Sequence, residues 1–235
     1  MTIPDRPPLW ALLGEGFSGL EGLRLAGQWR QLASLASGSG TLLLCPGWQA
    51  LDLSMLPLQR FLTQLGYDAR SWGIGRNDGN VSELIPRLAD RAAEEAARAD
   101  GPVVLLGWNL GGYIAREAAR ELPEAVRRVI TLGSPVVGGP KYTRMAPFYR
   151  LQGEDLDAIE EEVERRGLKP LAVPVHALYS RLDGIVSWEA CVDHREALTE
   201  NVEVRTTHFG FGVSPDVYRI VADRLARDVA LEVAG

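Results

Sequence analysis

The sequence predicts a single α/β domain, 1–235, in which a mainly parallel sheet is flanked by helices. Short apolar runs alternate along the chain with longer segments of helical periodicity, which is the pattern of parallel strands joined by helical crossovers. The apolar runs are continuous, as in strands buried on both faces. A length of 235 residues with 46% hydrophobic and 24% charged residues suits one globular domain with a sizeable core.

The predicted strands are short and bounded by turn residues. Residues 41–45, Thr-Leu-Leu-Leu-Cys, follow the turn Ser-Gly-Ser-Gly and contain almost only apolar side chains. The same pattern predicts strands at 67–72, 103–106, 126–132, 173–179 and 202–206. Parallel strands need long connections, and the intervening segments are long enough to provide them.

The predicted helices lie between these strands. Residues 54–65 carry apolar residues at helical spacing and end at Gly66, a common helix stop, and 83–99 are rich in alanine. Further helices are expected at 110–121, 188–198 and 215–229. The N-terminal segment, 1–40, is expected to contain one or two helices broken by glycines.

Residues 136–170 interrupt the alternation, because they contain no clear strand. An insert of this length in a compact α/β domain predicts a lid or cap over the site. Residues 154–166 are typical of a surface helix with a solvated acidic face. The insert also contains four large side chains for which core packing and substrate contact are equally expected: Tyr142, Met145, Phe148 and Tyr149.

Composition and charge exclude several classes of protein. A net charge of −6 argues against a general nucleic-acid binder, and two cysteines imply no disulfide framework. The first residues show no secretory signal and no apolar run is long enough to cross a bilayer, so we expect a cytoplasmic protein without a membrane span. Neither a dinucleotide motif nor a metal-ligand pair is present at the expected places, so no cofactor and no metal are expected.

Residues 107–112, Gly-Trp-Asn-Leu-Gly-Gly, have the spacing of a nucleophile elbow, Gly-x-Ser-x-Gly. They lie between a predicted buried strand and a predicted helix, where a sharp turn needs glycines on either side of its apex. Asn109 occupies the place of the nucleophile, although a carboxamide is not a useful nucleophile at neutral pH. The alternative interpretation is a tight turn whose asparagine tolerates unusual backbone angles.

An acid and a histidine follow two later strands of the predicted sheet. Asp183 stands in a polar turn after 173–179, and His208 follows the last predicted strand. Ligands collect at the carboxyl ends of parallel strands, so these two residues are the candidate acid and base. His176 lies within a strand and His194 on a predicted helix, so we expect neither to take part.

The loop after the first clear strand, 45–54, is a candidate oxyanion site. A backbone N–H of Trp48 or Gln49 would face that of Leu110, and two such donors could hold a developing oxyanion. A plain Pro-Gly turn is the alternative interpretation. The side chains of Gln49 and Trp108 are further candidates for substrate contact. Cys45, which ends the strand before this loop, is expected to be a buried apolar residue.

These motifs make the chain similar to the α/β-hydrolase superfamily, and in particular to small bacterial esterase/lipase-like members whose elbow reads Gly-Trp-Ser-Leu-Gly-Gly. The matching stretches are 45–79, 101–135, 173–188 and 201–226. The first forty residues and the insert are not covered. The resemblance implies an α/β-hydrolase fold with Asp183 as acid, His208 as base, and Trp48 and Leu110 as oxyanion donors. Asn109 departs from the family, which has serine there.

Three functions are compatible with this departure. In the first, the chain is an esterase for a small acyl ester whose serine was replaced, by drift or by design, so that ester hydrolysis is impaired. In the second, it is a pseudohydrolase that binds a small apolar or acyl ligand, or a protein partner, without turnover. In the third, His208 and Asp183 perform non-covalent, lyase-like acid–base chemistry with Asn109 as a hydrogen-bond donor. An intact acid and histidine favour the first and third.

Overall fold

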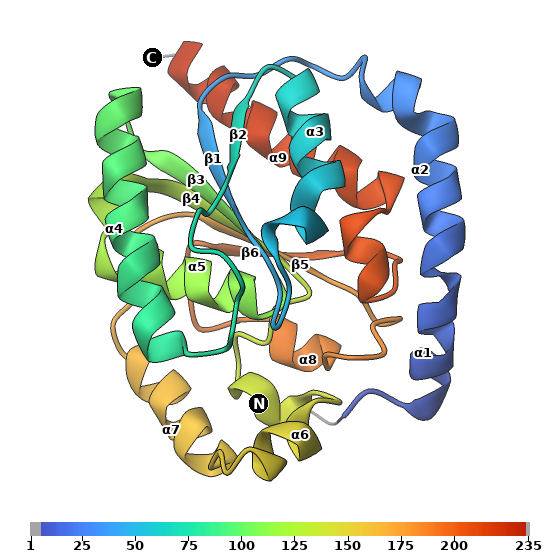
Figure 1. Ribbon diagram of the computed structural model, residues 1–235. Coiled ribbons are helices and arrows are strands. Elements are labelled where there is room, and N and C mark those ends of the chain that lie inside the picture. The colour runs from blue at the N-terminus through green and yellow to red at the C-terminus, as the bar shows by residue number, and fades with distance from the viewer. Residues whose placement is uncertain (1–5, 234–235) are drawn as a thin grey trace.

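The computed structural model describes residues 6–233, so the ends of the chain, 1–5 and 234–235, lie outside the account that follows (Figure 1). Its six strands are parallel and lie in the order β2-β1-β3-β4-β5-β6. The strands are β1 Thr41–Cys45, β2 Asp68–Ser71, β3 Val103–Trp108, β4 Val126–Leu132, β5 Val175–Tyr179 and β6 Thr199–Glu203. The predicted parallel sheet is therefore confirmed.

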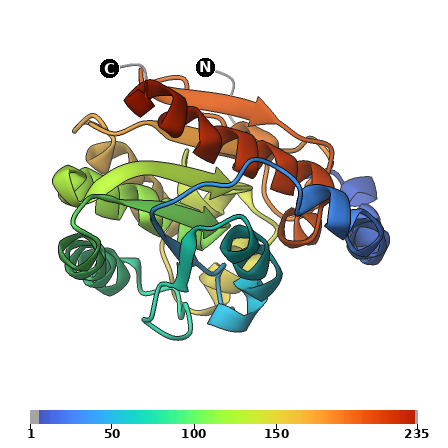
Figure 2. The ribbon, with the colours of Figure 1, turned by 90° about the horizontal axis from the view of Figure 1, so that it is seen from above.

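Helices cover both faces of the sheet (Figures 1 and 2). The helices are α1 Leu9–Gly14, α2 Ser18–Leu32, α3 Leu56–Gln64, α4 Val81–Ala99, α5 Leu110–Glu121, α6 Ala146–Leu151, α7 Leu156–Arg166, α8 Trp188–Cys191 and α9 Pro215–Val233. Short 3₁₀ turns are η1 Glu15–Phe17, η2 Asp52–Met55, η3 Pro123–Ala125, η4 Gly139–Tyr142 and η5 Phe209–Gly212. None of the helices described here is long and apolar enough to span a bilayer.

Alternate residues of each central strand enter two separate hydrophobic cores. Leu42 and Leu44 pack in the core formed with α2, α3 and α9, whereas Leu43 and Cys45 pack in the core formed with α4 and α5. Because both faces are buried, the strands read as continuous apolar runs in the sequence.

Strand β1 lies between β2 and β3, so the chain leaves β1 in one direction and returns on its other side. The connection after β1 leads to β2 and the connection after β3 leads to β4, so the two run in opposite directions from neighbouring strands. Open α/β sheets form their ligand crevice between two such loops, at the carboxyl edge of the sheet. These loops carry Trp48 and Asn109, and the topology explains why two segments sixty residues apart meet at one place.

Several predicted elements differ from the structure in their bounds by a few residues, and two of these differences have a clear structural reason. The helix expected at 188–198 ends at Cys191. Asp193 bonds to partners outside this helix instead: its carboxylate lies 2.5 Å from the Arg116 guanidinium, and its N–H donates to the Asn201 side-chain oxygen at 3.0 Å. His194 is therefore exposed in a turn, not on a helix. The last strand begins at Thr199, three residues before the expected 202–206. It is an edge strand with mixed burial, so hydrophobicity does not mark its start.

The segment 136–170 folds into η4, α6 and α7, without a strand of its own. Helix α7 begins at the cap Asp155, whose side chain accepts from the N–H groups of Asp157 and Ala158. It buries Leu156 and Val163 and exposes most of its acidic residues, as predicted for a surface helix.

Candidate active site

Asn109 stands at the sharp turn between β3 and α5. Its φ of 52° and ψ of −127° are strained for a residue other than glycine, as at the apex of a nucleophile elbow. A Cβ on Gly107 would lie 2.4 Å from the Gly111 carbonyl oxygen, and one on Gly111 would lie 2.3 Å from that of Pro46. Both glycines are therefore required by the close approach of backbone around Asn109.

A chain of short hydrogen bonds connects the candidate acid, base and elbow residue. Asp183 Oδ2 lies 2.7 Å from His208 Nδ1, and His208 Nε2 lies 2.7 Å from Asn109 Nδ2. The Leu110 N–H donates to Asn109 Oδ1 at 2.6 Å. A backbone N–H can only donate, so the Asn109 amide must present its NH₂ to His208. His208 therefore accepts at Nε2 and carries its proton on Nδ1, which donates to Asp183.

The candidate acid and base are both buried. Asp183 is 3% exposed and His208 is 1% exposed. The second oxygen of Asp183, Oδ1, accepts from the N–H groups of Ile185 and Val186, both at 2.8 Å. These bonds compensate for burying a carboxylate and fix its orientation toward the imidazole. The Trp108 ring packs against the His208 ring with centroids 5.5 Å apart.

The loop after β1 lies directly against the elbow. A Cβ on Gly47 would lie 3.3 Å from the Asn109 Cβ. The Gln49 N–H donates to the Asn77 carbonyl oxygen at 2.7 Å, so it is already engaged and the expectation that it serves as an oxyanion donor is wrong. Within the described part of the chain the Trp48 N–H has no acceptor. Trp48 and Leu110 remain the candidate pair of donors, although in this chain the Leu110 N–H donates to Asn109 Oδ1, an acceptor that a serine at position 109 would not provide.

Asn77 is a supporting residue that the sequence analysis missed. It is fully buried, its Nδ2 donates to the Pro46 carbonyl oxygen (2.9 Å), and its N–H donates to Ala50 (3.0 Å). It thereby braces the loop that carries Trp48. The available signal was its place in the polar turn Arg-Asn-Asp-Gly-Asn after β2, at the same edge of the sheet.

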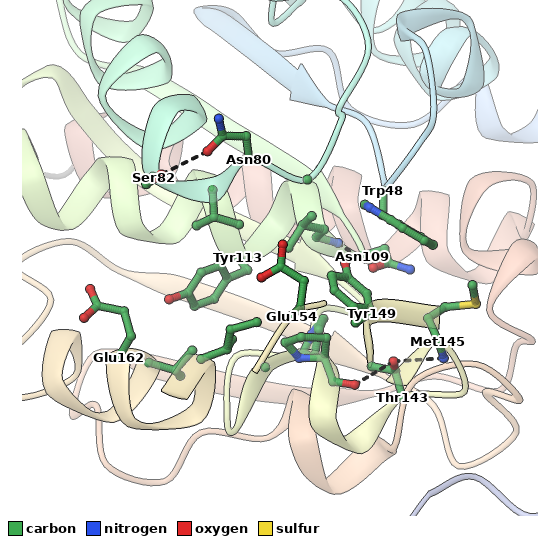
Figure 3. A pocket seen from close by; sticks show the side chains of 18 of the residues that line it. Trp48, Asn80, Ser82, Asn109, Tyr113, Thr143, Met145, Tyr149, Glu154 and Glu162 are labelled. Carbon is green, nitrogen blue, oxygen red and sulfur yellow. Dashed lines mark hydrogen bonds between the residues drawn. The ribbon is translucent and has the colours of Figure 1, made fainter. Parts of the chain in front are cut away.

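A cavity of about 830 Å³ opens above Asn109 and Leu110. Figure 3 shows Trp48, Tyr149 and Tyr113 around Asn109, with Glu162 farther from it. Apolar side chains from the loop after β1 and from α4, α5, α6 and α7 supply much of its wall: Trp48, Ile85, Tyr113, Met145, Tyr149 and Ile159. Its charged side chains are mostly acidic: Asp78, Glu154, Asp155, Glu162 and Arg166.

Of the expected substrate contacts, only some border this cavity. Met145 and Tyr149 do, and Tyr149 also stacks on Trp48 with ring centroids 5.0 Å apart. Tyr142 does not, because its hydroxyl turns toward Glu160 (2.6 Å); burial and this hydrogen bond raise the pKa of Tyr142 to about 12. Phe148 is 43% exposed and packs on the edge of Trp48.

Gln49 and Trp108, expected from the sequence as substrate contacts, do not border the cavity either. The Gln49 side chain donates to the Asp78 carbonyl oxygen at 3.1 Å, while the Trp108 ring lies beside His208 and Phe209. Both residues shape the surroundings of the site without facing its open space.

Cys45 is buried as expected. Burial, together with the charge of Asp52, raises the pKa of the Cys45 thiol well above its usual range, which suppresses the reactive thiolate. Within residues 6–233 no group of three or more His, Cys, Asp or Glu side chains could hold a metal ion.

Comparison with curated proteins finds relatives named as esterases. Over 91 residues the chain is 29% identical to a pimeloyl-[acyl-carrier protein] methyl ester esterase of Vibrio campbellii, a match covering 39% of this chain and 33% of that protein. Over 93 residues it is 29% identical to the protein of that name from Sodalis glossinidius, covering 40% and 34%. The match spans about a third of the length of these relatives. No family model matches the chain.

Similar solved structures cover most of the chain. Est1E from Butyrivibrio proteoclasticus matches with a TM-score of 0.60 at 14% identity, over 86% of this chain and 91% of that chain. The lipase BlEst2 from Bacillus licheniformis gives a TM-score of 0.60 at 15% identity, over 79% and 91%. An alpha/beta hydrolase from lagoon sediments of Mar Chica gives 0.57 at 14%, over 83% and 94%. The chain has the α/β-hydrolase fold.

Proposed function

We propose that the chain carries a carboxylic-ester hydrolase site of the Ser-His-Asp type in which Asn109 occupies the position of the nucleophile. The observation that supports this most directly is the hydrogen-bond chain from Asp183 through His208 and Asn109 to the Leu110 N–H. In this proposal Asp183 is the acid, His208 is the base and the Leu110 N–H is an oxyanion donor, and the group that would attack an ester is missing.

The position of the Asn109 amide explains how a serine would act there. A serine Oγ would take the place of the Asn109 Cγ, one bond short of the atoms that now contact His208 and Leu110. His208 Nε2 could then take the hydroxyl proton, and the Trp48 and Leu110 N–H groups could hold the oxyanion. In the chain as given, the amide itself occupies His208 Nε2 and the Leu110 N–H.

The bonds of the Asn109 amide affect the two alternative functions, non-covalent acid–base chemistry and ligand binding without turnover, in different ways. Non-covalent acid–base chemistry needs a free His208 Nε2, which the Asn109 amide takes, so this function is disfavoured. Ligand binding without turnover needs only the cavity, which remains beside Asn109. We infer that the unaltered chain binds an acyl ester or apolar ligand and hydrolyses esters barely above background.

The class of ligand is proposed from the cavity and from the names of the relatives. Apolar side chains such as Tyr113, Met145 and Tyr149 suit an acyl chain of a small-molecule ester. The curated relatives are named as methyl ester esterases, which supports an ester as the reacting group.

Restoring the serine tests the proposal. Asn109→Ser should raise the hydrolysis of a short-chain p-nitrophenyl ester by about 10³-fold or more, because the members of a triad act as a unit. The Asn109→Ser protein should also react covalently with one equivalent of a fluorophosphonate probe, whereas the parent should remain unlabelled. Ester hydrolysis rates and intact-protein mass spectrometry of both proteins measure these two effects.

Two control variants separate a restored triad from an incidental gain. Asn109→Ala removes the amide without adding a hydroxyl and should stay near background, and Asn109→Ser combined with His208→Ala should lose the gain. A folded Asn109→Ser protein that gains neither hydrolysis nor labelling would exclude acyl transfer and leave ligand binding.

We also propose that residues 136–170 act as a lid. Helices α6 and α7 contribute Tyr149, Ile159 and Val163 to the cavity wall, and Tyr149 stacks on Trp48 of the oxyanion loop. Lids belong to the less stable parts of a fold. Hydrogen exchange should therefore be faster in 146–166 than in β3 and β4, and a ligand should slow it. Equal protection of helices and sheet would contradict a moving lid.

A further inference from the structure

Glu15 is a buried carboxylate in an otherwise exposed stretch of the N-terminal segment. It lies in η1, between α1 and α2, and is 7% exposed, whereas Leu13 and Phe17 beside it are 79% and 62% exposed. Burying a carboxylate is costly unless hydrogen bonds replace its hydration. Its partners therefore show what it contributes.

Within residues 6–233, three hydrogen bonds to the Glu15 carboxylate come from the two loops that carry the candidate acid and base. Oε1 accepts from the N–H of Gly184, at 2.7 Å, and from that of His208 itself, at 2.8 Å. Oε2 accepts from the N–H of Phe209 at 3.0 Å. Gly184 directly follows Asp183, so one side chain joins the backbone beside the acid to the backbone of the base.

The neighbouring helix places Glu15 by close packing. A Cβ on Gly184 would lie 2.5 Å from the Ala11 carbonyl oxygen, so α1 rests on the loop that carries Asp183. Farther along, Glu21 accepts from the Thr206 hydroxyl (2.6 Å) and the Thr207 N–H (3.3 Å). The helical segment thus contacts both loops, and among its described residues only Glu15 bonds to His208 and to the neighbour of Asp183.

We propose that Glu15 is a positioning residue that fixes the distance between Asp183 and His208, which makes the turn η1 of the N-terminal segment part of the working site. A second link, from the Ser180 hydroxyl to the Thr206 carbonyl oxygen (2.5 Å), joins the same loops two residues before the base. Glu15 acts at the base itself. The effect of Glu15 on the hydrogen bond between His208 and Asp183 concerns the unaltered chain. Only its effect on kcat rests on the proposed esterase function.

The first experiment needs no catalysis. In the parent protein with ¹⁵N-labelled histidine, the Nδ1 proton of His208 should give a downfield resonance protected from exchange by its bond to Asp183. Glu15→Ala should broaden or abolish this resonance, while Glu15→Gln, which keeps one carbonyl oxygen for two of the donors, should retain it. Glu21→Ala is the matched control and should also retain it.

The second experiment measures kinetics in the Asn109→Ser background. Glu15→Ala should lower kcat by roughly 10- to 100-fold, because a small misplacement of the base is costly, with KM changed by about twofold or less. Glu15→Gln should restore most of kcat, and Glu21→Ala should leave it nearly unchanged. If Asn109→Ser has no activity, the proposed function fails while the histidine resonance still decides the role of Glu15.

A purely structural role would lower the melting temperature of Glu15→Ala without altering the His208 resonance or kcat, and that result would overturn the proposal. If Glu15→Ala does not fold, Glu15→Asp replaces it, because a carboxylate one methylene shorter cannot reach all three donors. Faster exchange of the His208 proton in Glu15→Asp supports the proposal, and unchanged exchange overturns it.

Discussion

The molecule buries two clusters of charged side chains that are held in different ways. Beside α5, the guanidinium of Arg116 lies 2.5 Å from Asp193, and that of Arg120 lies 2.9 Å from Glu196. At the carboxyl edge of the sheet, Glu15 instead accepts from backbone N–H groups, and Asp183 accepts from backbone N–H groups and from the His208 imidazole. Both clusters are nearly inaccessible to solvent.

The difference lies in what each carboxylate can still do. In the α5 cluster, permanent cations neutralise the carboxylates, so the cluster serves as a fixed cross-link between α5 and the loop before β6. In the site, Asp183 has an imidazole as its side-chain partner, and the hydrogen-bond chain continues to Asn109 at the cavity. Backbone donors fix the Asp183 carboxylate without supplying a competing charge, so this carboxylate can orient the His208 imidazole.

The largest expected difference in kcat is between two variants in which Asp183 or Asp193, both buried, is replaced by asparagine. In the Asn109→Ser background, Asp183→Asn should lower kcat by about 10⁴-fold, because an amide no longer selects the His208 tautomer that accepts a proton at Nε2. Asp193→Asn should leave kcat nearly unchanged and lower stability. Ester hydrolysis and urea unfolding of the two variants measure this. Equal losses of kcat would mean that the two clusters do not differ in function.

A smaller effect is expected from removing one cation of the α5 cluster. Arg116→Met should lower the free energy of unfolding by about 3–5 kcal/mol, because it leaves buried carboxylates without their partner. The exposed pair of Arg87 and Glu83 (3.1 Å) offers a matched control, and Arg87→Met should cost less than about 1 kcal/mol.

Urea unfolding of these two arginine variants gives the stabilities, and the His208 resonance reports on the site. Because the cluster beside α5 is proposed to be structural, Arg116→Met should leave that resonance in place at temperatures where the protein is folded. Loss of the resonance in a folded Arg116→Met protein would show that the clusters are coupled.

Most of the sheet and the centre of the site were predictable from the sequence, because their signals are local. Helix α5 and strand β4 have the predicted bounds, and the elbow glycines and Asn109 stand in six consecutive residues that join β3 to α5. Asp183 and His208 could be predicted because parallel strands bring their carboxyl ends to one edge. The last strand was misplaced because an edge strand need not be apolar.

The contributions of the N-terminal segment and the insert were decided by tertiary structure. Glu15 is 193 residues from His208 in sequence, and nothing in its neighbourhood predicts that partner. The insert offered four large side chains, of which Met145 and Tyr149 border the cavity while Tyr142 turns to Glu160. Hydrophobicity indicates that such a residue is buried or covered, and it does not indicate which neighbour it will meet.

The sequence by itself therefore determined the order of the elements, the strained turn at Asn109 and the two loops that hold Asp183 and His208. Each of these depends on interactions within a few residues or on the general geometry of parallel strands. Tertiary structure alone decided that the Asn109 amide occupies both His208 and the Leu110 N–H, and that Glu15 joins the loops of Asp183 and His208. Such hydrogen bonds depend on positions to within a fraction of an ångström, and those positions are fixed only when all the layers have packed.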